Sequence, residues 1–167
     1  MSAPEPAIRR ATVADRVPIF RMLEFYQHDL SDIWDQDLGA NGEFGYELSR
    51  YWHTQECHSF VATVAGHYAG FALVDRSVKL GVSGHWMDQF FVMRKYRRSG
   101  VGTTLAKGTF AALRGAWEVG EMLNNQGAQS FWRKVISQYT GGAFVEHKLL
   151  GGAWEGYVQC FKSLEPE

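Results

Sequence analysis

Apolar positions recur at helical spacing most clearly near the C-terminal end of the chain. Between residues 128 and 139 they fall at i, i+3, i+4 and i+7, and polar residues fill the positions between them. This pattern is typical of an amphipathic helix with one face in the core. Glycine commonly closes a helix, so the helix is expected to end at Gly141-Gly142. Its apolar positions are Ala128, Phe131, Trp132, Val135, Ile136 and Tyr139.

Two further segments show helical periodicity. Residues 100–114 place an apolar face on one side, and Gly115 supplies a natural stop. An earlier helix is expected after Thr12, which has the side chain of an N-cap, with its apolar face at Val17, Phe20 and Leu23. Pro18 leaves two alternatives for this helix, a start near the proline or a kink. A short helix is also expected around residues 46–52.

Shorter apolar runs bounded by turn residues predict strands. The expected strands are residues 7–10, 59–64, 68–77, 84–92 and 117–122, followed by a closing hairpin of 143–149 and 153–161. The hairpin turns at Gly151-Gly152. Helices and strands therefore mix along the chain without an internal linker. We expect a mixed α/β (α+β) fold in a single domain over residues 7–164, preceded by an N-terminal tail of residues 1–6.

Composition narrows the class of protein. The 167 residues are 46% hydrophobic and 21% charged, which is ordinary for a globular domain. Lys and Arg number 17 against 18 Asp and Glu. A net charge of −1 disfavours a bulk nucleic-acid binder, which usually carries a basic excess.

The sequence shows no pattern typical of membrane insertion, secretion or metal binding. No apolar run approaches the ~20 residues of a membrane-spanning helix, and residues 1–6 lack the regions of a signal peptide. Cys57 and Cys160 form no CxxC pair, and the six histidines show no metal-ligand spacing. We expect a cytoplasmic location, free thiols, no metal, no membrane association and no nucleic-acid partner.

The stretch from Phe90 to Thr103 carries the candidate chemistry. A predicted strand ends, an arginine-rich turn follows, and Gly100 and Gly102 open a helix. Backbone N–H groups at a helix start are unpaired and attract anions, and glycines let phosphate oxygens approach them. Arg97 and Arg98 add positive charge nearby. The alternative is an ordinary loop-to-helix turn with solvated arginines. The segment lacks both the GKS/T ending of a Walker motif and the third glycine of a dinucleotide fingerprint.

Two blocks of sequence resemble a known family. Arg97-Arg98-Ser99-Gly100-Val101-Gly102 resembles the R/Q-x-x-G-x-G/A signature of the GNAT (Gcn5-related) N-acetyltransferases. The eight residues from Asn125 to Trp132 resemble that family's second block, N-x-x-A-x-x-F/L-Y, with Trp132 in place of the usual tyrosine. Both blocks occur in the expected order with a predicted strand between them.

The resemblance implies a fold and a cofactor. The GNAT fold has a central, mixed, mostly antiparallel sheet with a splayed parallel strand pair, flanked by helices. The splayed strands are expected to be those ending at Val92 and near Met122, with acetyl-CoA between them. The first strand would hold the pantetheine arm, the turn would hold the pyrophosphate, and the second block would touch the cofactor. The implied cofactor-binding residues are Phe90, Phe91, Val92, Arg97, Arg98, Ser99, Gly100, Val101, Gly102, Thr103, Asn125 and Trp132.

The implied reaction is acetyl transfer from acetyl-CoA to a small-molecule or peptide amine by direct attack in a ternary complex. One alternative is a non-catalytic GNAT-fold module that binds CoA as a sensor or interaction domain. Another is a nucleic-acid-binding domain that uses the Arg94–Arg98 cluster. The family's tyrosine often protonates the departing thiolate, and an indole N–H cannot do so at neutral pH. Asp88 and Glu118 are the candidate catalytic carboxylates, because strand alternation places them best; Gln89 and Glu121 fall on the opposite faces.

An acidic segment between residues 24 and 56 bears on the acceptor. It holds eight carboxylates and the single cationic side chain of Arg50, with aromatic residues interleaved. The resemblance places the segment after the first helix over the acceptor side of the cleft. The segment thus favours a cationic acceptor through Coulomb steering and ring faces, although a solvated loop that only promotes solubility is the alternative. The closing hairpin offers a surface for a homodimer.

Overall fold

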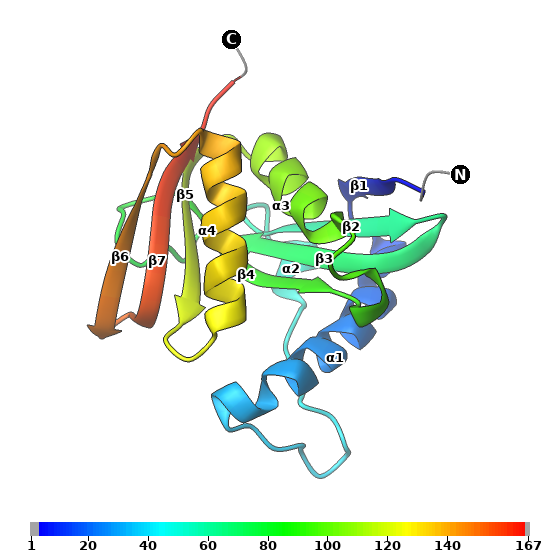
Figure 1. Cartoon of the computed structure of the whole chain (residues 1–167). Coiled ribbons are helices and arrows are strands. Elements are labelled where there is room, and N and C mark those ends of the chain that lie inside the picture. The colour runs from blue at the N-terminus through cyan, green and yellow to red at the C-terminus, as the bar shows by residue number, and fades with distance from the viewer. Residues whose placement is uncertain (1–3, 166–167) are drawn as a thin grey trace. The chain divides into compact units, whose positions relative to one another are not determined.

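The computed structural model describes residues 4–165, which divide into two compact units. The first unit contains the chain up to Leu73 together with Gln89–Leu105, and the second contains Val74–Asp88 and the chain from Ala106 onward. Two strands and one helix, β3, β4 and α3, therefore begin in one unit and end in the other. Figure 1 gives the labels of the elements.

The first unit contains four strands or parts of strands, two complete α-helices, the start of a third and two short 3-10 helices. Its elements are β1 (Pro6–Arg10), η1 (Val13–Asp15), α1 (Arg16–Trp34), α2 (Arg50–His53), β2 (His58–Val64), most of β3 (His67–Asp75), the end of β4 (His85–Val92), η2 (Arg94–Tyr96) and the start of α3 (Val101–Ala112). The strand order is β1-β2-β3-β4, and β1 lies antiparallel to β2.

The apolar face of α1 builds the core of this unit. Ile19, Met22 and Leu23 pack with side chains of β2, β3, β4 and α2. Helix α1 is longer than the sequence pattern indicated and ends at Trp34, where Asp35 adopts a left-handed φ of 48°. Pro18 lies in the first turn, where its missing N–H costs no hydrogen bond, so the helix starts normally before it. The helix expected over 46–52 is confined to the four residues of α2.

The second unit contains the remaining strands and helix α4. Its elements are the end of β3, the start of β4, the rest of α3, β5 (Gly115–Met122), α4 (Gln126–Thr140), β6 (Phe144–Gly151) and β7 (Trp154–Ser163). The strand order is β4-β5-β7-β6. Strands β4 and β5 pair in parallel at His85↔Trp117 and Trp86↔Glu118, whereas β5 and β6 both pair antiparallel to β7.

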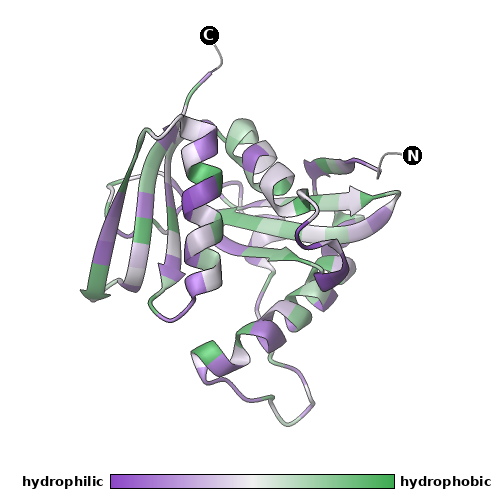
Figure 2. Ribbon diagram, in the orientation of Figure 1, coloured by the Kyte–Doolittle hydropathy of each residue, from purple (hydrophilic) through white to green (hydrophobic). Residues whose placement is uncertain are grey.

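Aromatic rings fill the core of the second unit. The Phe110 ring centroid lies 4.9 Å from Trp117, 4.9 Å from Phe161 and 5.3 Å from Tyr139. Figure 2 shows the alternation of hydrophilic and hydrophobic residues along α4 that the sequence predicted. Gly141 closes this helix with a left-handed φ of 62°, also as predicted.

The expected fold class is confirmed. Within residues 4–165 the strands are mostly antiparallel with one parallel pair, and helices flank them. Residues 1–3 of the expected tail lie outside the described residues, and Pro6 already belongs to β1. The single domain over 7–164 stays a prediction. None of the helices described is both long and apolar enough to cross a bilayer.

Candidate active site

The end of β4 is tightly held within the first unit. Phe91 is buried, with ring centroids of Phe71 and Tyr26 each 5.9 Å from its own. A Cβ atom on Gly70 of β3 would lie only 2.4 Å from the Phe91 carbonyl oxygen, so β3 requires glycine there. Sequence reasoning missed Gly70, although a glycine inside a strand pattern often marks such a close backbone approach.

The turn after β4 has an unusual backbone. We call residues 97–103 the phosphate loop. Arg98 adopts a left-handed φ of 62° and Gly100 a φ of 86°. Ser99 stabilises the turn because its Oγ donates to the Tyr96 carbonyl at 2.6 Å. A Cβ atom on Gly100 would meet no heavy atom within 4 Å, so the space beside this backbone is open.

The phosphate loop leads directly into α3. The first bond of the helical ladder runs from the Thr104 N–H to the Gly100 carbonyl at 3.0 Å. The N–H groups before Thr104 have no earlier helical carbonyl to bind. Val101 and Leu105 are buried and hold this first turn in place. The helix start thus offers fixed N–H donors and positive partial charge, an arrangement that fits a diphosphate group.

The two arginines of the loop differ in placement. The Arg97 side chain turns back to the first unit, where its Nε donates to the Val92 carbonyl at 2.8 Å and its guanidinium pairs with Asp29 of α1. Arg98 is exposed and follows the strained backbone. The structure therefore brings Arg98 and the helix start together and directs the Arg97 guanidinium to β4 and α1.

The second sequence block forms the start of α4. Asn125 is the N-cap, and its Oδ1 accepts the Ala128 N–H at 3.2 Å. Gln129 donates to the carbonyls of Met122 and Leu123 at 2.9 and 3.0 Å. Trp132 is 5% exposed, with its ring centroid 6.1 Å from that of Phe110. This block therefore fixes the helix to the strand before it.

The carboxylates predicted to be catalytic both belong to the second unit. Glu118 is buried and accepts three successive backbone N–H groups, from Lys79 at 2.5 Å, Leu80 at 3.1 Å and Gly81 at 2.6 Å. This carboxylate anchors the loop between β3 and β4. Asp88 is half-buried in the middle of β4.

Glu121 has a more unusual environment than either of them. It is 3% exposed, its Oε1 accepts from Gln159 Nε2 at 2.9 Å, and its Oε2 has no partner among the described residues. Gln159 also donates to Glu146, which is paired with Arg133 of α4 at 2.7 Å. Burial, reinforced by the nearby Glu146 charge, raises the pKa of Glu121 to about 8. The sequence placed Glu121 on the opposite face to Glu118 but gave no indication of this burial.

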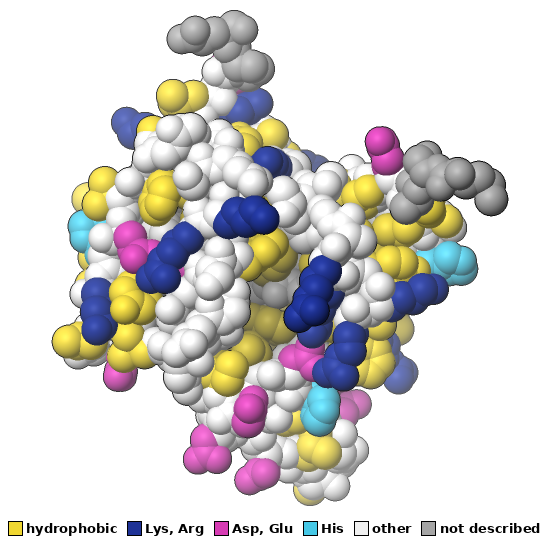
Figure 3. Space-filling model, in the orientation of Figure 1, with side chains coloured by type: hydrophobic (Ala, Val, Ile, Leu, Met, Phe, Trp, Pro, Cys, Tyr) yellow, Lys and Arg dark blue, Asp and Glu magenta, His cyan; other side chains and the backbone are white. Residues whose placement is uncertain are grey.

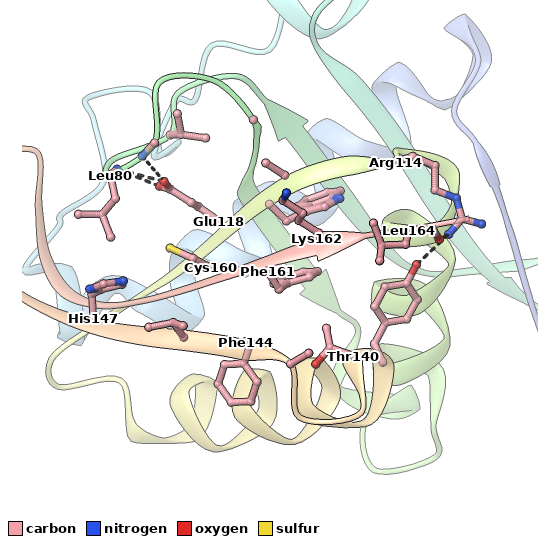
Figure 4. A pocket seen from close by; sticks show the side chains of 18 of the residues that line it. Leu80, Arg114, Glu118, Thr140, Phe144, His147, Cys160, Phe161, Lys162 and Leu164 are labelled. Carbon is pink, nitrogen blue, oxygen red and sulfur yellow. Dashed lines mark hydrogen bonds between the residues drawn. The ribbon is translucent and has the colours of Figure 1, made fainter. Parts of the chain in front are cut away.

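A groove of about 1370 Å³ lies within the second unit (Figure 4). Its walls include Glu118 and the loop it anchors, Cys160 of β7 and His147 of β6. Burial, together with the neighbouring Glu118 charge, raises the pKa of Cys160 to about 11. The thiol is therefore protonated at neutral pH and is a poor nucleophile.

The acidic segment belongs to the first unit. The carboxylate of Glu24 is occupied by two backbone hydrogen bonds, which it accepts from the N–H groups of Phe44 and Gly45 at 2.9 and 3.1 Å. Six other carboxylates are exposed: Asp32, Asp35, Asp37, Glu43, Glu47 and Glu56. Figure 3 shows acidic side chains gathered at the lower end of the view. Across residues 4–165 no three His, Cys, Asp or Glu side chains are grouped to hold a metal ion.

A comparison with protein families gives one match. The family described as the acetyltransferase (GNAT) family matches residues 20–136 of this chain. A search of the curated proteins finds no match.

Solved structures share the fold at low sequence identity. A histone acetyltransferase HPA2 and related acetyltransferase from Corynebacterium glutamicum is 18% identical, with a TM-score of 0.67 over 96% of this chain and 98% of that one. An acetyltransferase from Thermus thermophilus is 12% identical, with a TM-score of 0.68 over 97% and 99%. Ard1 from Thermoplasma volcanium is 18% identical, with a TM-score of 0.60 over 96% and 99%.

Proposed function

The chain belongs to the acetyltransferase (GNAT) family, and from this premise we propose that it transfers an acetyl group from acetyl-CoA directly to an amine. The observation that carries the proposal is the phosphate loop. Its left-handed backbone at Arg98 and Gly100, the open space beside Gly100 and the start of α3 together fit a diphosphate. Acetyl-CoA would supply the acetyl group as a thioester.

The residues proposed to hold the cofactor divide by role. The N–H groups of the phosphate loop would bind the pyrophosphate, and the backbone from Phe90 to Val92 would bind the pantetheine arm. The Oδ1 atom of Asn125 accepts the capping hydrogen bond of α4, so its side-chain N–H groups would donate to the cofactor. Trp132 would contribute at most an apolar wall, because it is packed in the core.

Proton handling is proposed to rest on Asp88. The carboxylate of Glu118 is already occupied by three N–H donors, which favours an anchoring role over proton transfer. A general base typically contributes ~100-fold to 10,000-fold in rate. Asp88→Asn is therefore expected to lower kcat and flatten its pH dependence, whereas Glu118→Gln should mainly lower the melting temperature. If both variants fold and lose kcat equally, the assignment of the base to Asp88 alone is wrong.

The proposed acceptor is a cationic small molecule or a basic peptide end. The six exposed carboxylates of the acidic segment support this choice, since they would steer a cation towards the first unit. Salt weakens such steering, so kcat/KM for a cationic amine should fall as ionic strength rises. Neutralising Asp35, Asp37 and Glu43 together, three of the six, should weaken that salt dependence. A preference for anionic amines would contradict this assignment.

The decisive experiment is a screen of amines with acetyl-CoA, in which released CoA thiol is measured. Polyamines, aminoglycosides and peptides with free N-termini should be compared with acidic amino acids. A ternary mechanism predicts intersecting initial-velocity lines and no acetylated protein in the absence of acceptor. CoA binding without turnover on any amine would instead favour the sensor alternative.

A homodimer is proposed to form through the C-terminal hairpin. Strand β6 ends the strand order, and Val145 and Leu150 on it are 58% and 75% exposed. Light scattering of the wild type and of a Val145→Lys variant measures the association directly. A monomeric wild type would remove this part of the proposal.

A further inference from the structure

Arg97 makes three contacts that face away from the phosphate loop. Its Nε donates to the Val92 carbonyl at 2.8 Å, its terminal nitrogen pairs with Asp29, and its guanidinium lies 5.4 Å from the Phe91 ring centroid. Each of these contacts lies within the first unit. The side chain therefore fastens the end of β4 to helix α1.

Asp29 is the ion-pair partner of Arg97. It lies on α1 and also pairs with Arg94 at 3.6 Å, so one carboxylate holds both the first residue of the short η2 helix and its C-cap, Arg97. The side chains of Asp29 and Arg97 are 25% and 39% exposed. Exposed ion pairs contribute little to stability, typically about 0–1 kcal/mol. The value of the pair therefore lies in the geometry it imposes.

The geometry in question is the strained entrance to the phosphate loop. Met93 N–H binds the Ala69 carbonyl at 2.8 Å, so β3 holds the chain just after β4, and Arg97 holds Val92 by its carbonyl. The Arg97 backbone is extended, with a φ of −70° and a ψ of 152°, and Arg98 follows at a φ of 62°. For a residue with a side chain this conformation costs about 1–2 kcal/mol. Contacts on the preceding residue are what keep the turn in that conformation.

We propose that Asp29 and Arg97 form a positioning pair that pre-forms the phosphate loop, and that Arg98 supplies the side-chain cation for the phosphates. This rests on the proposed binding of CoA. Asp29 lies outside both sequence blocks, 68 residues before Arg97. The pair also ties cofactor binding to α1, the helix that leads into the acidic segment.

The test measures CoA affinity by calorimetry for Asp29→Asn, Arg97→Gln and Arg98→Gln, at low and high salt. Loss of the pair is expected to raise the Kd about 10-fold with the wild-type salt dependence, because a loop that is less often in its competent form binds less tightly. Arg98→Gln should raise the Kd and also weaken its salt dependence, since it removes a charge that meets the ligand. Glu155→Gln, an exposed carboxylate of the second unit, controls for the change in net charge.

Three further readouts separate positioning from a general structural defect. The double variant Asp29→Asn/Arg97→Gln should bind CoA as weakly as either single variant, because both remove one interaction. Asp29→Glu should restore most of the affinity. In the steady state the KM for acetyl-CoA should rise while kcat stays near that of the wild type.

Several results would overturn the proposal. If Asp29→Asn tightens CoA binding, Asp29 competes with the phosphates for Arg97 and does not position it. Unchanged affinity in both single variants, or a weakened salt dependence in Arg97→Gln, has the same consequence. A wild type that does not bind CoA at all would instead defeat the proposed function itself.

Discussion

Helices α3 and α4 begin in similar sequence but in different surroundings. Each has glycine as its second residue, Gly102 in α3 and Gly127 in α4, and each start belongs to one of the two blocks that resemble the GNAT motifs. At α3 the preceding loop is left-handed and open. At α4 the Asn125 side chain caps the helix and Gln129 ties it to the end of β5.

This difference between the starts of α3 and α4 indicates that the two sequence blocks have different roles. At the α3 start the backbone donors are left available, so substitutions there should change ligand affinity. In the β5–α4 region, residues 121–132, polar groups and rings bind one another, so substitutions there should change the stability of the protein.

Trp132→Ala should lower the free energy of unfolding the most. The ring is 5% exposed and packs against Phe110 and Phe131, and truncating such a side chain typically costs about 3–5 kcal/mol. Urea unfolding measures the loss, and Trp132→Phe, which keeps most of the packing, is the control. A stable Trp132→Ala protein that no longer binds CoA would show that this block contacts the ligand.

Glu121→Gln should change how stability depends on pH. The pKa of Glu121 is raised from its usual 4.5 to about 8, so the folded protein binds a proton that the unfolded chain has lost between those values. Wild-type stability therefore falls as pH rises from about 4.5 to about 8. Each pKa unit corresponds to about 1.4 kcal/mol, which puts the total at a few kcal/mol.

The measurement is thermal unfolding from pH 5 to pH 9. The Glu121→Gln protein should match the wild type near pH 5 and exceed its melting temperature at pH 9, because no buried charge forms. Glu155→Gln, at an exposed position of β7, should follow the wild-type profile. Parallel profiles for wild type and Glu121→Gln would mean that Glu121 stays ionised in the fold.

Gly102→Val should weaken CoA binding about 100-fold, because its side chain would block hydrogen bonds from the α3 start to charged phosphates, each worth about 1.5–3 kcal/mol. Valine fits a helix better than glycine does, so the fold should be retained. Gly127→Val is the matched variant at the α4 start, where a Cβ atom meets nothing within 4 Å. It should bind CoA nearly as the wild type does. Equal losses in the two variants would erase the distinction between the two helix starts.

Arg98→Gly should have the smallest effect on stability. It should make the protein slightly more stable and bind CoA less tightly. Glycine relieves the left-handed strain of about 1–2 kcal/mol but adds freedom to the unfolded chain, so a gain of less than about 1 kcal/mol is expected. CoA affinity should fall because a charge is lost. Arg98→Gln loses the same charge but keeps the strained backbone. Its CoA affinity should therefore fall as in Arg98→Gly, whereas its melting temperature should stay at the wild-type value.

Most of the elements could be predicted because their causes are local. The i, i+3, i+4, i+7 pattern of α4 and its glycine stop were found as predicted, and the closing hairpin forms with its turn one residue later than predicted, at Gly152-Ala153. The end of α1 was missed. The helix continues for about two further turns past Tyr26, through a stretch of mixed burial without a clear stop signal, until Asp35 adopts a left-handed backbone. The acidic character of that stretch concealed a helix that the core side chains Gln27 and Leu30 continue.

The sequence by itself determined the fold class, the order of the elements and the two blocks that indicate an acetyltransferase, because periodicity, glycine position and motif spacing are all written in short segments. Only the tertiary structure decided how single charged side chains are used. Glu118 accepts N–H groups up to 39 residues away, Arg97 pairs with Asp29 across 68 residues, and Glu121 is buried beside Gln159, 38 residues away. The energy of a charge depends on which groups and how much water surround it, and those neighbours come from distant parts of the chain.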